Sequence, residues 1–309
     1  PARPRRAGAS DSRTQYLPMR ITQPLSYRLD LPQQYPDSEI SAPLVLDSPH
    51  SGTAYPPDFA AAVDFGALRT AEDTWVDDLW GDAIDMGVPM IAAAFPRAYI
   101  DANRAPDEID ELLLDQPWPD AINASPKVKL GKGLIWRMLD DGTPLYNRKL
   151  TVAEVRHRID ACWKPYHAAL GQVLDNAHRK FGKVWHINCH SMPSVAGAFA
   201  TDRPGLVHPD FVLGDRDGST SDPAFREFIA AWLRERGYDV TVNDPYKGVE
   251  LVRAFGRPQE GRHSLQIEIN RKLYMDEVTL RPSENYGRLK ADLRDLTAAL
   301  ILWTRAQTA

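Results

Sequence analysis

Apolar residues in this chain fall into short runs that alternate with longer stretches of helical periodicity. Strand-forming runs occur in "APLVLDSP", "VWHINCHSMPS", "PDFVLGDRDGSTSDP", "GYDVTVNDPY" and "HSLQIEIN", and "GVPMIAAAFPRAYIDANR" predicts two short strands separated around Pro96. Helical periodicity covers about residues 68–86, 152–180, 223–236 and 286–306, with an interruption at Pro165 and a helix end near Gly182. Strands that alternate with helices of this length predict a single α/β domain, with a mixed, largely parallel central sheet flanked by helices.

Two segments depart from this alternation. Residues 106–150 are rich in proline and turn dipeptides, and the Asp141-Gly142 pair fits a hairpin. Long irregular excursions inside a domain are commonly functional, so we expect a lid or wall over a site. Residues 1–20 contain several arginines without an apolar segment, which predicts a flexible N-terminal arm before a domain spanning residues 21–309.

The composition narrows the class of protein. With 43% hydrophobic and 26% charged residues the chain is typical of a globular protein with a substantial core. It contains no run of roughly 18 apolar residues, as a membrane span requires. Two cysteines, Cys162 and Cys189, cannot build a disulfide framework, which favours a reducing, cytoplasmic location, and neither has CxxC spacing. The net charge of −5 gives no basic footprint for nucleic acid, so local arginines or lysines must hold any acidic ligand.

Two histidines occupy equivalent positions at the ends of predicted strands. His50 follows the apolar run of "APLVLDSPHSG", and His190 stands near the end of "VWHINCHSMPS". Ligand-binding groups collect at the carboxyl edge of an open α/β sheet, so the two imidazoles could meet there. Adjacent strand residues point to opposite faces, so Cys189 cannot readily pair with His190 as nucleophile and base. A buried structural thiol is the favoured interpretation.

The candidate chemistry is dispersed, because the chain lacks HExxH, G-x-S-x-G, P-loop and dinucleotide motifs. A catalytic zinc requires three nitrogen or oxygen ligands and an open position. His50, His190 and one acid of the Glu72-Asp73 pair could supply the ligands, and Glu268 could accept a proton. Structural alternatives stay open: a strand-end histidine is often only hydrogen-bonded, and the acid pair suits the first turn of a helix. Glu268 alternates with two isoleucines, which predicts a buried carboxylate.

Several cations are candidates for binding an acidic ligand. "FPRAYIDANRAP" contains Arg97 and the Asn103-Arg104 pair, and "PYKGVELVRAFGRP" contains Lys247, Arg253 and Arg257. Ordinary surface charge explains most single arginines. For an acidic chain with a proposed metal site, however, an arginine fork is well suited to hold a substrate carboxylate.

Eight stretches, in order and covering about residues 42–302, resemble the N-formylglutamate amidohydrolase family: "SPHSG", "EDTWVDDL", "FPRAYIDANR", "WKPYHAAL", "INCHSMPS", "VLGDRDGSTSDP", "NDPYKGVELVRAFGRP" and "HSLQIEINRKLYMDE". The resemblance implies a fold similar to zinc carboxypeptidases and aspartoacylases. It also implies that His50 and His190 bind zinc, that Glu268 is the general base, and that Asn103 with Arg104 clamps a substrate carboxylate.

One position departs from the pattern of those zinc enzymes, which place an acidic ligand three residues after the first histidine. Here that position is Thr53. The third ligand must come from elsewhere, and the resemblance favours Asp73 within the shared D-x-x-V-D core, with Glu72 as the alternative. Asp77, four residues after Asp73, would lie on the same helical face and could orient a ligand.

The implied function is hydrolysis of N-formyl-L-glutamate to formate and L-glutamate, a step of histidine degradation. Arg97 is a candidate for stabilising the oxyanion, and Arg253 for helping Arg104 bind the substrate. The expected partner is a small acidic N-acyl amino acid, with no nucleic acid and no membrane, and the expected cofactor is one Zn²⁺ or another divalent ion. Two alternatives remain: deacylation of another N-acyl amino acid or small peptide, and a catalytically silent binding protein.

Overall fold

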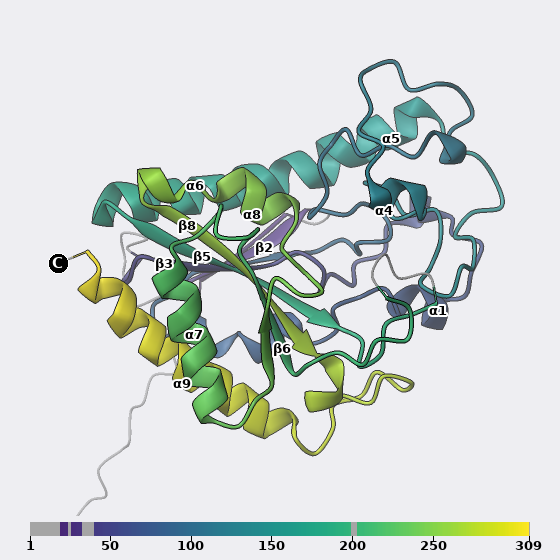
Figure 1. Cartoon of the computed structure of the whole chain (residues 1–309). Helices are drawn as coiled ribbons and strands as arrows, with labels where there is room; N and C mark the ends of the chain where they lie inside the picture. Colours follow the sequence, from purple (N-terminus) through teal and green to yellow (C-terminus); the bar gives the residue numbers. More distant parts are fainter. Residues whose placement is uncertain (1–18, 24–25, 33–39, 199–202, 309) are drawn as a thin grey trace, which may run out of the picture.

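One mixed sheet organises the chain (Figure 1), and the computed structural model describes residues 19–23, 26–32, 40–198 and 203–308. Within those residues the sheet has eight strands in the order β1-β2-β4-β3-β5-β8-β6-β7. The strands are β1 (Met19–Gln23), β2 (Tyr27–Leu31), β3 (Leu44–Ser48), β4 (Met90–Ala93), β5 (Val184–Met192), β6 (Phe211–Gly214), β7 (Val240–Val242) and β8 (Arg262–Asn270). The four central strands β4, β3, β5 and β8 are parallel, whereas β1, β2 and β6 add antiparallel pairings. The expectation of a mixed, largely parallel sheet is confirmed.

Helices cover both faces of this sheet (Figure 1). One side carries α5 (Val152–Arg158), α6 (Lys164–Phe181) and α8 (Glu250–Phe255), and the other carries α2 (Val76–Leu79), α3 (Asp82–Asp85), α7 (Pro223–Glu235) and α9 (Tyr286–Ala306). The short helices α1 (Phe65–Arg69) and α4 (Pro126–Lys129) lie in the connecting loops, and single turns occur at Pro57–Phe59, Glu111–Leu113, Pro258–Glu260 and Arg271–Leu273. Across the described residues, no helix is both long and apolar enough to cross a membrane.

Residue alternation along β5 and β8 gives the sheet one apolar and one polar central face. Trp185, Ile187 and Cys189 of β5 enter the apolar layer under α7 and α9, together with Leu265, Ile267 and Ile269 of β8. The intervening residues His186, Asn188, His190, Ser264, Gln266 and Glu268 are buried polar groups. Burial also raises the pKa of the Cys189 thiol well above its ordinary value, so this cysteine is a poor nucleophile.

The long helix expected over residues 152–180 is present, but the interruption expected at Pro165 is wrong, because the helix continues through this residue. Between α5 and α6 it widens into a π turn at Ile159–Trp163. Pro165 has no N–H to donate to the carbonyl of Ala161, and the Ser26 hydroxyl donates to that carbonyl instead, at 2.6 Å. The helix ends as expected at Gly182, which adopts a left-handed conformation with φ of 75°.

Two elements expected from the sequence are wrong. The single helix over residues 68–86 is instead three short helices, because the chain turns sharply at Trp75, whose φ is 70°. In this turn the backbone N–H of Asp73 donates to the carbonyl of His50 at 3.0 Å, which a continuous helix would prevent. The second strand that the sequence predicted, after Pro96, is also absent from the structure. Residues 97–103 form consecutive turns, in which the N–H of Tyr99 donates to the carbonyl of Pro96 at 3.0 Å.

The excursion at residues 106–150 packs against the α6 side of the molecule. Leu134, Trp136 and Leu145 are buried in the same apolar cluster as α6. Gly142 has φ of 87°, and Met138 pairs with Pro144 across the turn that contains it, in agreement with the hairpin expected there. The segment therefore forms a packed wall, and its movement as a lid stays a prediction. Of the expected N-terminal arm, residues 1–18 lie outside the described residues.

A buried carboxylate ties three elements together beneath the edge of the sheet. Asp47 of β3 accepts hydrogen bonds from the Tyr166 hydroxyl of α6 (2.5 Å) and the Asn188 amide of β5 (2.8 Å), and lies 2.8 Å from His186 Nε2. Burial opposes its ionisation, but the charge and hydrogen bonds of His186 hold the pKa of Asp47 below its ordinary value. The strands carrying the candidate ligands are thus joined at their polar face.

We predict that Asp47→Ala lowers the free energy of unfolding by about 3–5 kcal/mol, because it leaves buried polar partners without their acceptor. Urea denaturation measures the change. The control is Asp120→Ala: the Asp120 side chain is 67% exposed and forms a surface ion pair with Arg156, so a loss of about 1 kcal/mol or less is expected. Equal effects of the two substitutions would show that the hydrogen bonds of Asp47 contribute no more to stability than a surface ion pair does.

Candidate metal and active site

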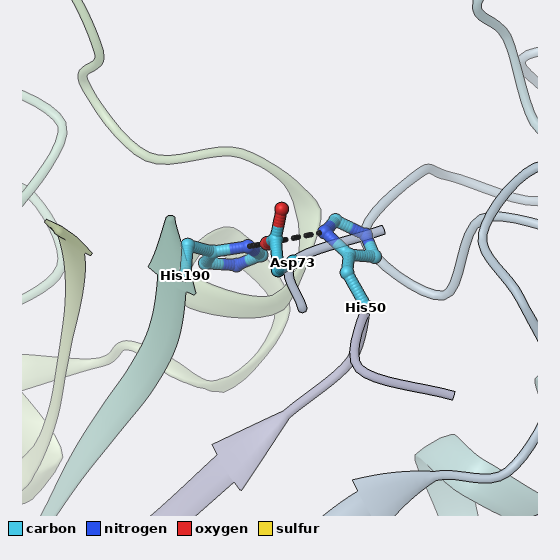
Figure 2. A group of neighbouring side chains, drawn as sticks. All are labelled: His50, Asp73 and His190. Atoms are coloured by element: carbon cyan, nitrogen blue, oxygen red, sulfur yellow. Dashed lines mark hydrogen bonds and ion pairs between the residues drawn. The ribbon is translucent and has the colours of Figure 1, made fainter. Parts of the chain in front are cut away.

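Two histidines and one aspartate converge at the carboxyl edge of the sheet. His50 follows β3, Asp73 lies in the turn before α2, and His190 is in β5. The Nδ1 atoms of His50 and His190 lie 3.3 and 3.0 Å from the same oxygen, Oδ2 of Asp73, which stands between the two rings (Figure 2). All three side chains are buried, and one ligand atom from each lies within 4.8 Å of the others. The structure therefore brings together the three residues expected to bind a metal.

The outer nitrogens of both imidazoles face acceptors. His50 Nε2 lies 2.6 Å from Asp101 Oδ1, and His190 Nε2 lies 2.7 Å from Asn188 Oδ1. If an ion replaced the Nδ1–H···Oδ2 hydrogen bonds to Asp73, the Asp101 carboxylate would favour the His50 tautomer with hydrogen on Nε2, so that the Nδ1 lone pair would face the ion. His190 Nε2 lies near both the Asn188 oxygen and the amide nitrogen of Asn103 (3.0 Å). Two imidazole nitrogens and one carboxylate oxygen form a donor set that fits a divalent ion such as zinc.

Two arginines hold the other oxygen of Asp73. Arg271 Nη2 and Arg97 Nη1 lie 3.2 and 3.5 Å from Asp73 Oδ1. Burial opposes ionisation of Asp73, but hydrogen bonds with His190 and His50 and the charge of Arg97 hold its pKa well below the ordinary value. Asp73 is therefore a negatively charged carboxylate at neutral pH and could act as an anionic metal ligand.

Asp101 is a buried carboxylate that contacts the Nε2 atom of His50 and several other groups. It is 3.1 Å from Arg97 Nη2 and accepts the indole N–H of Trp136 at 3.2 Å and the backbone N–H of Asn103 at 2.8 Å. Burial opposes its ionisation, but the charges of His50 and Arg97 hold the pKa of Asp101 well below the ordinary value. A charged carboxylate at this place would strengthen His50 as a metal ligand.

Glu268 stands beside the three converging residues. It is in β8, directly opposite His190 of β5 in the strand pairing, and only 8% of its surface is exposed. Gln266 donates to it at 2.8 Å. Burial, reinforced by the nearby negative charge of Asp73, raises the pKa of Glu268 to about 7. A carboxyl group with this pKa can both take and release a proton near neutral pH.

Of the three residues expected to bind substrate, Asn103 contacts a candidate metal ligand, whereas Arg104 and Arg253 have other partners. The Nδ2 atom of Asn103 lies 3.0 Å from His190 Nε2, so this side chain belongs to the site. Arg104 is buried and donates to its neighbour's carbonyl at 2.8 Å and to the carbonyl of Lys132 at 3.1 Å. Arg253 is 56% exposed and forms two 2.7 Å hydrogen bonds with Glu250.

Glu72 and Asp77 face away from the histidines. Glu72 accepts hydrogen bonds from Tyr55 (2.6 Å) and Arg69 (3.1 Å), although it is adjacent to Asp73 in sequence. The expectation that Asp77 shares a helical face with Asp73 is wrong, because the helix begins only at Val76. Asp77 pairs instead with Arg28 at 3.0 Å.

Sequence reasoning missed Asp101, Asn188 and Arg271. Asn188 could have been found, since it shares a strand face with His190 two residues later. Arg271 directly follows β8, which carries Glu268, and so was also a candidate. Nothing local marks Asp101, because the expected strand around it is a series of turns.

Fold and site together define an α/β protein with a buried His-Asp-His group and an adjacent carboxylate at the carboxyl edge of parallel strands. The profile of the N-formylglutamate amidohydrolase family matches residues 42–275. The chain belongs to this family.

Named relatives agree with this assignment. The chain is 29% identical over 277 residues to an N-formylglutamate deformylase of Pseudomonas aeruginosa, a match covering 86% of this chain and 96% of that protein. It is also similar to the crystal structure of N-formylglutamate amidohydrolase from Ralstonia eutropha, at 47% identity and a TM-score of 0.86, over 92% of this chain and 99% of that one. A gene product of Agrobacterium tumefaciens, 18% identical with a TM-score of 0.55 over 90% and 96% of the two chains, shares the fold.

We predict that His190→Ala weakens binding of a divalent ion by at least about tenfold, because even partners of a ligand contribute that much. Metal content after dialysis, measured by mass spectrometry, tests this, with about one equivalent expected for the unmodified protein. His157→Ala, a change at an exposed histidine of α5, is the control and should retain the ion. Equal metal content in both variants would exclude His190 as a ligand.

Proposed function

We propose that this chain is a zinc-dependent amidohydrolase that converts N-formyl-L-glutamate and water to formate and L-glutamate. The main observation that supports this proposal is the convergence of His50, Asp73 and His190. Beside them lies the carboxyl group of Glu268, whose pKa of about 7 suits proton transfer. The substrate is proposed from family membership and from relatives named for deformylation of N-formylglutamate.

The three converging residues would hold the ion. His50 and His190 would offer their Nδ1 atoms and Asp73 its Oδ2 atom, with the tautomer of His50 set by Asp101. A bound divalent ion would act as a Lewis acid and lower the pKa of a water molecule toward about 7.

Glu268 would carry the proton in both halves of the reaction. As the oxygen of water attacks the formyl carbon, the Glu268 carboxylate would take a proton from that water. When the carbon–nitrogen bond breaks, the protonated Glu268 would deliver this proton to the departing nitrogen. The pKa near 7 supports this double role, because neither protonation state is strongly favoured at neutral pH.

Arg97 would stabilise the negative charge that develops on the formyl oxygen. Its guanidinium contacts both Asp73 and Asp101, and its Nε atom is buried with no hydrogen-bond partner among the described residues. Arg104, beside Asn103, is proposed as a ligand of a substrate carboxylate, since its two backbone contacts use only part of its donors. A role for Arg253 stays a prediction, because it would have to release Glu250.

A substrate panel tests the proposed activity. Zinc-loaded protein is assayed with formyl, acetyl and carbamoyl derivatives of glutamate, aspartate and glutamine by measuring the free amino acid released, with formate measured as well for the formyl derivatives. We expect the highest kcat/KM for N-formyl-L-glutamate. A higher value for another acyl group would support a different deacylase, and turnover of none would indicate a silent binding protein.

We predict that Glu268→Gln lowers kcat by about a hundred- to ten-thousand-fold, because the amide cannot accept the proton. The metal content and KM should change little, since shape and most hydrogen bonding are retained. Steady-state kinetics with metal analysis tests this, and Glu260→Gln, at an exposed acid near the start of β8, is the control. A near-normal kcat would refute the assignment, and loss of the ion would instead make Glu268 a ligand.

A further inference from the structure

Lys132 is a nearly buried cation in the wall formed by residues 106–150. Only 6% of its surface is exposed. Within the described residues its ammonium has one charged partner, the carboxylate of Asp140, whose side chain is 55% exposed. The two partners therefore differ in solvent exposure: Lys132 is enclosed, whereas the Asp140 carboxylate can be solvated by water at low cost in free energy.

The backbone around Lys132 is fixed to the turn that carries the site residues. Its carbonyl accepts the Arg104 guanidinium at 3.1 Å, and two residues later the carbonyl of Leu134 accepts the N–H of Asp101 at 2.7 Å. At Gly133 a Cβ atom would lie 2.5 Å from a neighbouring backbone oxygen, so this close approach requires glycine. Lys132 is thus held in a defined position relative to Asp101.

The indole of Trp136 connects Lys132 to the centre of the site. Its N–H donates to Asp101, and its ring centroid lies 4.9 Å from Arg97 Cζ and 5.6 Å from Lys132 Nζ. Two cations therefore lie near one ring. Arg97 pairs with Asp73, whereas Lys132 pairs with Asp140.

Asp140 experiences the combined field of these cations. Burial opposes its ionisation, but the charges of Lys132, Arg97 and Arg271 lower its pKa. Arg97 and Arg271 are already paired with Asp73, one of the candidate ligands. Among the described residues Lys132 pairs with one carboxylate, that of Asp140, whose side chain is 55% exposed, so a ligand carboxylate could take the place of Asp140 beside the ammonium.

We infer that Lys132 binds the side-chain carboxylate of the substrate, and that Asp140 occupies this position until the substrate displaces it. The inference rests on the proposed function, which supplies a substrate with two carboxylates. Lys132 fits the carboxylate remote from the scissile bond, because Arg97 pairs with Asp73 and Asp101 at the site, whereas Lys132 pairs with Asp140. The exchange keeps the ammonium paired and returns Asp140 to water. As an internal competitor, Asp140 reduces the apparent affinity for substrate.

Two substitutions with opposite expected effects test this. Lys132→Gln should raise KM for N-formyl-L-glutamate about 10- to 100-fold, the range for a hydrogen bond to a charged group. The kcat should stay nearly unchanged, because this contact is the same before and during the reaction. Asp140→Asn should lower KM. With N-formyl-L-glutamine, which lacks the side-chain charge, Lys132→Gln should have little effect. The control is Lys129→Gln, at an exposed lysine of α4 in the same segment.

A binding measurement separates this inference from the proposed reaction. Calorimetric titration of zinc-loaded protein with glutarate, a five-carbon dicarboxylate, should show weaker binding to Lys132→Gln and tighter binding to Asp140→Asn. If the unmodified protein hydrolyses N-formyl-L-glutamate but Lys132→Gln keeps its KM and glutarate affinity, the inference is wrong and the proposed function stands. If the unmodified protein neither turns over this substrate nor binds glutarate, both fail. Should Lys132→Gln not fold, an unchanged KM in Asp140→Asn overturns the inference.

Discussion

A buried anionic carboxylate, Asp73, is the constraint on which the site depends. A charge removed from water requires compensation, and this one has four partners: two imidazoles on one oxygen and two arginines on the other. These partners come from parts of the chain far apart in sequence, so the charge is stable only where the fold brings them together. The same arrangement leaves two ring nitrogens and an oxygen aimed at one point, as a metal site requires.

The sheet supports this arrangement through a second buried carboxylate, Asp47. Because a carboxylate only accepts hydrogen bonds, Asp47 fixes the amide of Asn188 with its nitrogen inward and its oxygen toward His190. The orientation of a candidate ligand is thus determined by a residue on the neighbouring strand. Stability of the core and preparation of the site depend on the same hydrogen bonds.

Residues 106–150 supply side chains that would contact the substrate under the proposed function. Trp136 of this segment contacts Arg97, Asp101 and Lys132. The ends of β3 and β5, the turn before α2 and β8 supply the candidate metal ligands and base. The candidate reacting centre therefore lies at the carboxyl edge of the sheet, and the groups that would contact the remote end of a substrate come from residues 106–150. Such a division allows recognition to change without disturbing the chemistry.

The sequence by itself determined the elements whose signals are local. Alternation along β5 and β8 placed His190 and Glu268 on a polar face opposite Cys189, and Gly182 marked the end of α6, because these properties depend on neighbouring residues alone. Tertiary structure decided the rest. Glu72 and Asp73 are equivalent as neighbouring acids, and only the turn at Trp75 sends Asp73 to the histidines and Glu72 to Tyr55. Pairing of Asp101 with His50, and of Lys132 with Asp140, joins turns whose packing no periodic pattern encodes, since their partners are defined only once the sheet and its loops have assembled.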